Sequence, residues 1–141
     1  MESYVLDKTF LSAGSIGTYL CVRNGTGSPT SLSDIVNRAA LAIGTLAVGS
    51  LVPMGVSQIG CSESGKEIIV RMLGISKVKL QVVSGTVMVS RFVRPATHAG
   101  VKAINKGGGT AGILGQVVYV EGSGVGSTGQ LISVMVNPGY I

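Results

Sequence analysis

Two stretches of the chain, residues 54–72 and 115–136, repeat one short pattern. Each has a glycine at or near its start, a short apolar run, a loop of small residues that ends in glycine, and a second apolar run. A polar residue follows the loop glycine in both, Lys66 in the first and Gln130 in the second. Short apolar runs bounded by glycine are typical of β-hairpins, because glycine allows tight turns. The repeat therefore predicts an all-β chain built from hairpins.

The composition supports this prediction. Hydrophobic residues make up 45% of the 141 residues, but aromatic residues only 4%, and tryptophan is absent. The core must therefore come mainly from aliphatic side chains, of which the branched ones favour strands. The 22 glycines disfavour long helices. We expect a mainly β fold, a single domain of antiparallel hairpins arranged as a sandwich or barrel.

The rest of the chain divides into an N-terminal arm, residues 1–12, and one β-rich domain over residues 13–141 that contains both repeated stretches. Tyr4, Leu6 and Phe10 are candidate anchors in the arm. Further strands are predicted at residues 16–23, 75–83, 86–92 and 101–104.

For the predicted strands at 75–83 and 86–92, alternation indicates which side chains share a face. It places four residues on one face of the strand at 75–83 and two on one face of the strand at 86–92. These residues are Ile75, Val78, Leu80 and Val82, followed by Val87 and Val89.

The segment between the first strand and the first repeated stretch has two interpretations. A short helix near residues 32–42 fits Ser31 as its cap and the helical spacing of Leu32, Ile35 and Val36. An extended segment fits nearly as well. Residues 39–56 are almost uncharged, but they contain Pro53, several glycines and small alanines, which disfavours a membrane span.

Two glycine-rich loops resemble phosphate-binding motifs. Residues 124–129 spell GVGSTG, a literal GxGxxG, yet a strand-like run follows it where a dinucleotide-binding fold needs a helix. Residues 106–110, KGGGT, carry the lysine before the glycines, the reverse of a phosphate-binding loop. Both are predicted to be plain loops, and no cofactor is expected.

No set of residues predicts catalysis or metal binding. His98 is the only histidine, and its sequence neighbours offer no nucleophile or carboxylate partner. The six acidic residues form no pair or cluster that suggests a metal site. Cys21 and Cys61 have no metal-ligand spacing and are predicted to be reduced and buried. We therefore expect a protein that is not an enzyme.

The chain is basic, with 11 lysines and arginines against six acidic residues and a net charge of +5. Such a charge is compatible with an acidic partner surface, but the scattered basic residues fit a solvated face of a sheet better. A nucleic-acid-binding β module is an alternative function, although the aromatic residues are dispersed and only Arg91-Phe92-Val93-Arg94 combines basic and aromatic side chains.

Two segments of the sequence resemble the capsid cement, or head decoration, proteins of tailed bacteriophages. One is residues 53–74, with PMGVSQ and SGKEIIVR, and the other is residues 113–138, with ILGQVVYVE and GQLISVMVNP. Proteins of that family are small, rich in glycine and valine, and mainly β. Lys66 and Gln130 depart from the family pattern, which usually has an acidic residue after the loop glycine.

The resemblance implies a structural protein, made in the host cytoplasm, that sits on the outer surface of the virion head. Its expected partners are the phage major capsid protein and further copies of itself, as a homotrimer, with no membrane and no small-molecule substrate. The candidate contact residues in the arm, the apolar segment and the basic strand are Tyr4, Leu6, Phe10, Leu46, Val48, Leu51, Arg91 and Arg94.

Overall fold

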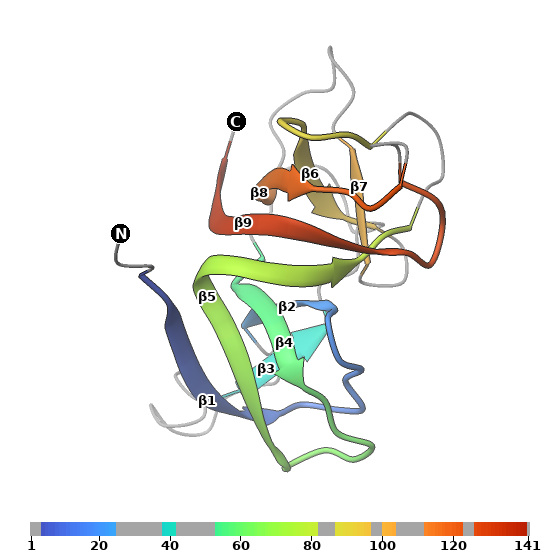
Figure 1. Ribbon diagram of the computed structural model, residues 1–141. Coiled ribbons are helices and arrows are strands. Elements are labelled where there is room, and N and C mark those ends of the chain that lie inside the picture. The colour runs from blue at the N-terminus through green and yellow to red at the C-terminus, as the bar shows by residue number, and fades with distance from the viewer. Residues whose placement is uncertain are drawn as a thin grey trace.

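The computed structural model describes residues 4–24, 38–41, 53–81, 87–96, 100–103, 112–122 and 126–140. All regular secondary structure in these ranges is β, and no helix occurs among them. The strands are β1 (Leu6–Ser12), β2 (Cys21–Asn24), β3 (Arg38–Leu41), β4 (Gly55–Ile59), β5 (Glu67–Lys79), β6 (Phe92–Pro95), β7 (Val101–Ala103), β8 (Gly112–Tyr119) and β9 (Leu131–Tyr140) (Figure 1). The prediction of a mainly β fold is confirmed.

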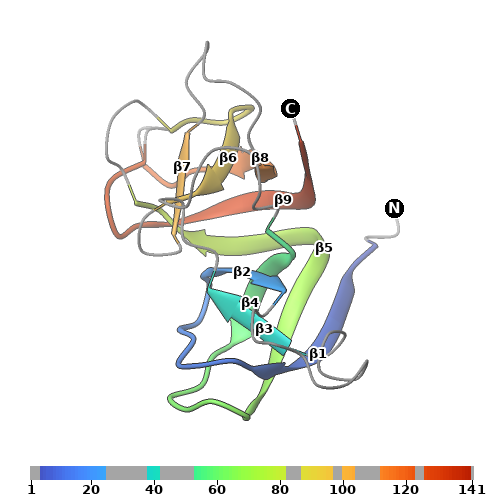
Figure 2. The ribbon, with the colours of Figure 1, turned by 180° about the vertical axis from the view of Figure 1, so that it is seen from behind.

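The strands form one 9-stranded sheet in the order β1-β3-β2-β4-β5-β9-β8-β6-β7. An additional pairing of β1 with β5 closes β1 to β5 into a first barrel. An isolated parallel bridge between Leu80 and Val101 brings the end of β5 to β7, so β5 to β9 curl into a second barrel. Figures 1 and 2 show the two barrels as stacked lobes, with β5 running through both.

Strand β5 belongs to both barrels. Its first half pairs with β1 and β4, and its second half, from Gly74, pairs with β9. Gly74 has a φ of 107°, a conformation that side-chain-bearing residues rarely adopt. A Cβ there would also lie 2.9 Å from the carbonyl oxygen of Tyr4. The glycine therefore allows β5 to change barrels and the start of the chain to pass close by.

Each barrel has its own apolar core. Phe10, Ile16, Val22, Ile68 and Val70 fill the first barrel. A larger cluster fills the second, and it is made of Cys21, Val56, Val78, Leu80, Val87, Val93, Val101, Leu114, Val117, Val120, Ile132, Val134 and Val136. Most of these residues are aliphatic and lie on strands, as the low aromatic content predicts.

The hairpins β4–β5 and β8–β9 have the same irregularity at the same place. Each has a β-bulge, in which one extra residue sits in the first strand, Gln58 in β4 and Val118 in β8. The paired residues around the bulges are Ser57 with Val70 and Ile59 with Ile69 in the first hairpin, and Val117 with Val134 and Tyr119 with Ser133 in the second.

Glycines occupy corresponding places in the two hairpins. A Cβ on Gly55 would overlap the carbonyl oxygen of Arg71, and a Cβ on Gly115 would overlap that of Met135. The loop glycines also match, because Gly65 and Gly129 have φ values of 79° and 87°. Each pattern glycine is therefore required by close backbone approach or by a left-handed turn.

The correspondence extends beyond the hairpins to the whole of each barrel. Cys21 of β2 pairs with Val56 of β4, just as Phe92 of β6 pairs with Gln116 of β8. The residues with positive φ that are not glycine, within the described ranges, are Tyr19 (61°) and Ser90 (70°), which stand two positions before those strand residues.

The strands that begin the two barrels, β1 and the second half of β5, also correspond to each other. Ser12 donates its N–H to Lys66 and accepts from Gly65, and Leu80 makes the same pair of bonds with Gln130 and Gly129. Thus β1 corresponds to the second half of β5. The chain is a tandem repeat of one barrel, with β5 ending the first copy and beginning the second.

Several sequence-based predictions are corrected here. Residues 38–41 of the predicted helix form strand β3, and the rest of that segment lies outside the described ranges. The predicted strand at 16–23 begins only at Cys21, with a single bridge at Ile16. The strand predicted from Ile75 is the continuation of β5 from Glu67.

The predicted facing of two residues is also wrong. Ile75 is 47% exposed, because Gly74, Ser76 and Val78 occupy the inner face of β5. Val87 and Val89 do not share a face. Val87 is buried, whereas Val89 lies in a turn and is 48% exposed.

The N-terminal segment is part of the sheet from Leu6 onward, since β1 pairs with both β3 and β5. No helix within the described residues has the length and apolar character needed to cross a membrane.

Candidate interaction surface

An exposed row of side chains crosses the outside of the second barrel. Phe92 is paired with Gln116, Gln116 with Met135, and Met135 with Ile75. Directly paired residues point to the same face of a sheet, so these four side chains lie side by side over about 14 Å. Phe92 is 44% exposed, Met135 41% and Ile75 47%, and Gln116 is exposed as well. These four residues are called the outer row.

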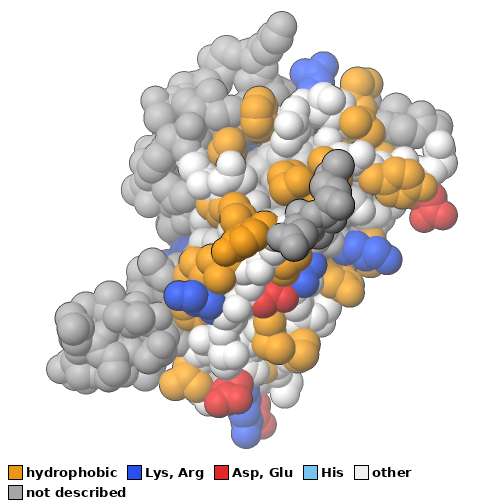
Figure 3. All heavy atoms as spheres, turned by 60° about the vertical axis from the view of Figure 1, so that its left-hand side comes forward, with side chains coloured by type: hydrophobic (Ala, Val, Ile, Leu, Met, Phe, Trp, Pro, Cys, Tyr) orange, Lys and Arg blue, Asp and Glu red, His pale blue; other side chains and the backbone are white. Residues whose placement is uncertain are grey.

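More exposed apolar side chains border the outer row. Val118 and Tyr119 lie at the end of β8, and Val89 lies in the turn before β6. On the side of the molecule where β1, the bend of β5 and the end of β9 lie, hydrophobic side chains alternate with basic and acidic ones (Figure 3). Clusters of exposed apolar side chains are more informative about binding than isolated ones. The outer row is therefore the candidate interaction surface.

An ion pair lies at one end of the outer row. The Arg71 guanidinium donates from Nε and Nη2 to the two Asp7 carboxylate oxygens, each over 2.8 Å, and from Nη1 to the Ile75 carbonyl oxygen over 2.8 Å. The hydrogen bonds from Arg71 lower the pKa of Asp7, and those to Asp7 raise the pKa of Arg71. The pair joins β1 to β5 beside the bend at Gly74.

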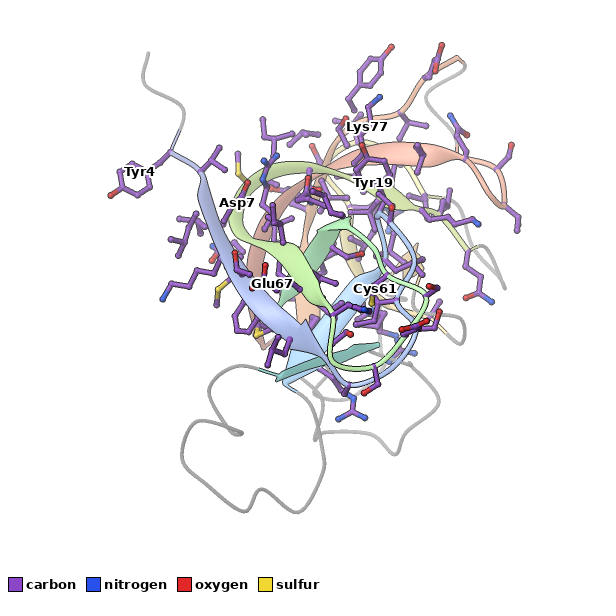
Figure 4. The ribbon with its side chains drawn as sticks, turned by 90° about the horizontal axis from the view of Figure 1, so that it is seen from below. Tyr4, Asp7, Tyr19, Cys61, Glu67 and Lys77 are labelled. Carbon is purple, nitrogen blue, oxygen red and sulfur yellow. The ribbon has the colours of Figure 1, made fainter. Side chains whose placement is uncertain are left out.

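The predicted contact residues of the arm have different environments. Tyr4 is 81% exposed and projects away from the barrels at the start of the chain (Figure 4). Leu6 is also exposed, next to Leu73 of β5. Phe10 is only 7% exposed and lies in the core of the first barrel, where it offers a partner almost no surface.

Of the basic candidates, Arg91 is exposed next to Phe92, at the edge of the outer row. Arg94 is partly buried, and its Nε has no hydrogen-bond partner. Leu46, Val48 and Leu51 lie outside the described residues. The structure does not bring the arm and the basic strand together, since β5, β9 and β8 lie between β1 and β6 along the sheet.

The two cysteines are free thiols. Cys21 is buried as predicted, and burial raises the pKa of its thiol. The prediction for Cys61 is wrong in one respect, because this residue is only partly buried. Within the described part of the chain, no group of three or more His, Cys, Asp or Glu side chains could hold a metal ion.

The loop that contains the GxGxxG connects β8 to β9, and strand β9 follows it from Leu131, as the sequence predicts. Two of its described N–H groups are hydrogen-bonded within the second barrel. Gly126 N–H donates to the Val87 carbonyl oxygen over 3.0 Å, and Ser127 N–H donates to the Gln130 side chain over 2.9 Å. His98 and the loop at 106–110 lie outside the described residues.

Sequence reasoning missed most of the outer row. Strict period-two counting back from Val78 would have placed Ser76 inside and Ile75 outside. The same counting from Ile132 and Val134 places Met135 outside together with Ser133. No comparable signal exists for Phe92, whose exposure depends on which face of the sheet curls inward.

Comparisons with known proteins found a similar fold among solved structures. No family model matches the chain, and no curated protein matches it. Among solved structures, the fold is similar to that of the head fiber gp8.5 N base of bacteriophage phi29, with a TM-score of 0.60 and 14% sequence identity over 95% of each chain. The similarity spans both barrels and is a likeness of fold.

Proposed function

We propose that this protein is a structural component of a phage head that binds the outer surface of the capsid and stabilises it across neighbouring coat subunits. The observation that carries the proposal is the likeness of the whole fold to the base of a phage head fiber. The repeated glycine-bounded hairpins, on which the resemblance to capsid cement proteins rests, support the same proposal.

The proposed mechanism needs no reaction. A protein that binds only the assembled or expanded capsid stabilises that state by mass action. The net charge of +5 favours contact with an acidic coat surface. The partners are the major capsid protein and, in a homotrimer, further copies of this chain.

Co-sedimentation with capsids tests the proposal. Purified protein is mixed with empty unexpanded capsids, with expanded capsids and with neither, and each mixture is pelleted. We expect the protein to pellet with capsids, and expanded capsids to unfold at a higher temperature when it is bound. A gel-shift assay with free DNA runs alongside. Protein that stays in the supernatant but shifts DNA in a salt-sensitive manner would contradict the proposal and favour a nucleic-acid-binding module.

A further inference from the structure

The two barrels of one chain are held together through the outer face of β2 and β4. Cys21 and Val56 point away from the core of the first barrel, yet both are 0% exposed and belong to the apolar cluster of the second. The Cys21 thiol lies 3.9 Å from the Gly100 carbonyl oxygen at the start of β7. The partner of this face is therefore the β5–β7 side of the second barrel.

Polar contacts reinforce the same face. Lys79 N–H donates to the Tyr19 carbonyl oxygen over 2.9 Å. The side chain of Gln58, the bulge residue of β4, donates to the Ser76 hydroxyl over 2.8 Å. Leu20 lines a groove with Lys79 and its neighbours, so the contact extends along the edge of β5.

The second barrel carries this face again, and there its described residues are exposed. The register assigns each residue of the contact a counterpart, and all of the counterparts are exposed. The counterparts of Tyr19, Leu20, Cys21, Val56 and Gln58 are Ser90, Arg91, Phe92, Gln116 and Val118.

We propose that this second face binds the first barrel of another copy of the chain, so that barrels continue head to tail from one molecule to the next. The receiving side is that of β1 and β3, which corresponds to the β5–β7 side used within the chain. Both sides have the same backbone arrangement, since Ser12 pairs with Ala39 in parallel as Leu80 does with Val101.

Charge and exposure fit this partner. Within the chain, Leu20 and Lys79 line the same groove, and the residues that correspond to these two are Arg91 and Leu11. Leu11 is 41% exposed, and its partner across the sheet is Glu67, an exposed carboxylate. Arg91 of one copy would therefore lie next to an apolar side chain and an acidic one on the next copy.

Such a contact joins two different faces, so it repeats from copy to copy and gives a ring where its rotation closes and a filament where it does not. The inference rests on the homo-oligomer of the proposed function and gives it a contact surface. It is tested on the protein alone, without capsids. A failure here therefore leaves capsid binding standing, and a failure to bind capsids leaves this contact standing.

Two substitutions on the second barrel test the face, with sedimentation equilibrium as the measurement. Phe92→Glu places a charge at the centre of the contact and should weaken self-association about 30-fold, as loss of a central apolar contact does. Tyr119→Glu is the matched control, since its counterpart Ile59 stays 55% exposed beside the contact within the chain. The control should associate like the wild type. A wild type that is monomeric at every concentration, or equal loss in both variants, overturns the proposal.

Charge reversal tests the partner. Arg91 and Glu67 are both exposed, so reversing them leaves the cores intact. Arg91→Glu alone and Glu67→Arg alone should each weaken association about fivefold, within the range of an exposed ion pair. The double variant should recover most of that loss, because opposite charges again face each other across the contact. An equal mixture of the two single variants should recover part of it, because opposite charges face each other wherever the two variants alternate. Absence of recovery in both overturns the head-to-tail contact.

Discussion

The ion pair of Asp7 and Arg71 gives the chain a defined response to acid. The hydrogen bonds from Arg71 hold the pKa of Asp7 below its unfolded value of about 3.9. At pH values between the folded and unfolded pKa, the unfolded chain binds more protons, so stability rises with pH there. The stabilisation is therefore complete above about pH 5 and is lost as the pH falls through the folded pKa.

We expect Asp7→Asn to lower the free energy of unfolding by about 0.5–1 kcal/mol at pH 7, a value kept small because the pair is partly exposed to solvent. Urea unfolding at pH 7 and pH 3 measures the difference between variant and wild type. The difference should shrink at pH 3. An equal difference at both pH values would show that the loss does not come from the carboxylate charge.

The two cysteines should differ in reactivity. Cys21 is fully buried between the barrels with a raised thiol pKa, whereas Cys61 is partly exposed. Because the thiolate is the reacting species, one thiol per native chain should react rapidly with a disulfide reagent and the second only after unfolding. Cys61→Ser should abolish the rapid phase. A rapid phase that survives this substitution would place the reactive thiol at Cys21.

At the scale of the element, the glycines that begin the two hairpin strands are sites of close backbone approach. Gly115→Ala would push a methyl group into the carbonyl oxygen of Met135. We expect a loss of about 1–3 kcal/mol of unfolding free energy, as for overpacking. Gly139→Ala, in the same hairpin but with open space at its Cβ, is the control and should change stability by less than about 0.5 kcal/mol. Equal losses in urea unfolding would show that the close approach to the Met135 carbonyl oxygen is not the cause.

The hairpins were predictable because their glycines have local causes, namely turns and backbone contacts within one pair of strands. The extent of β5 was not. Gly74 and the serine at 76 interrupt the apolar pattern, which suggests two strands, whereas the glycine allows one strand to bend between barrels. Likewise, the exposure of Phe92 depends on which face of the sheet curls inward, a property of the closed barrel that its sequence neighbours do not determine.

At the scale of the whole molecule, the contact between barrels was also hidden from the sequence. In the sequence, Cys21 and Val56 are indistinguishable from ordinary core residues. The structure shows that they lie on strands of the first barrel but pack in the apolar core of the second. Because β5 and this contact join the barrels, we expect them to unfold together.

Val22→Ala tests this expectation. Val22 is 0% exposed in the core of the first barrel, and the truncation should cost about 2 kcal/mol. If the molecule unfolds as one unit, the slowest-exchanging amides of β8 and β9 in the second barrel should lose the same protection as those of β4. Hydrogen exchange followed by mass spectrometry gives both values. Faster exchange confined to the first barrel would show that the barrels unfold independently.

The shared strand also has a mechanical meaning. A load that pulls the barrels apart along β5 acts parallel to its ladders with β1, β4 and β9, so many hydrogen bonds resist it at once. A load that pulls a neighbouring strand away sideways would break the same bonds one after another. The molecule should therefore resist shear along β5 more strongly than peeling of a strand away from β5, so its mechanical strength depends on the direction of the force.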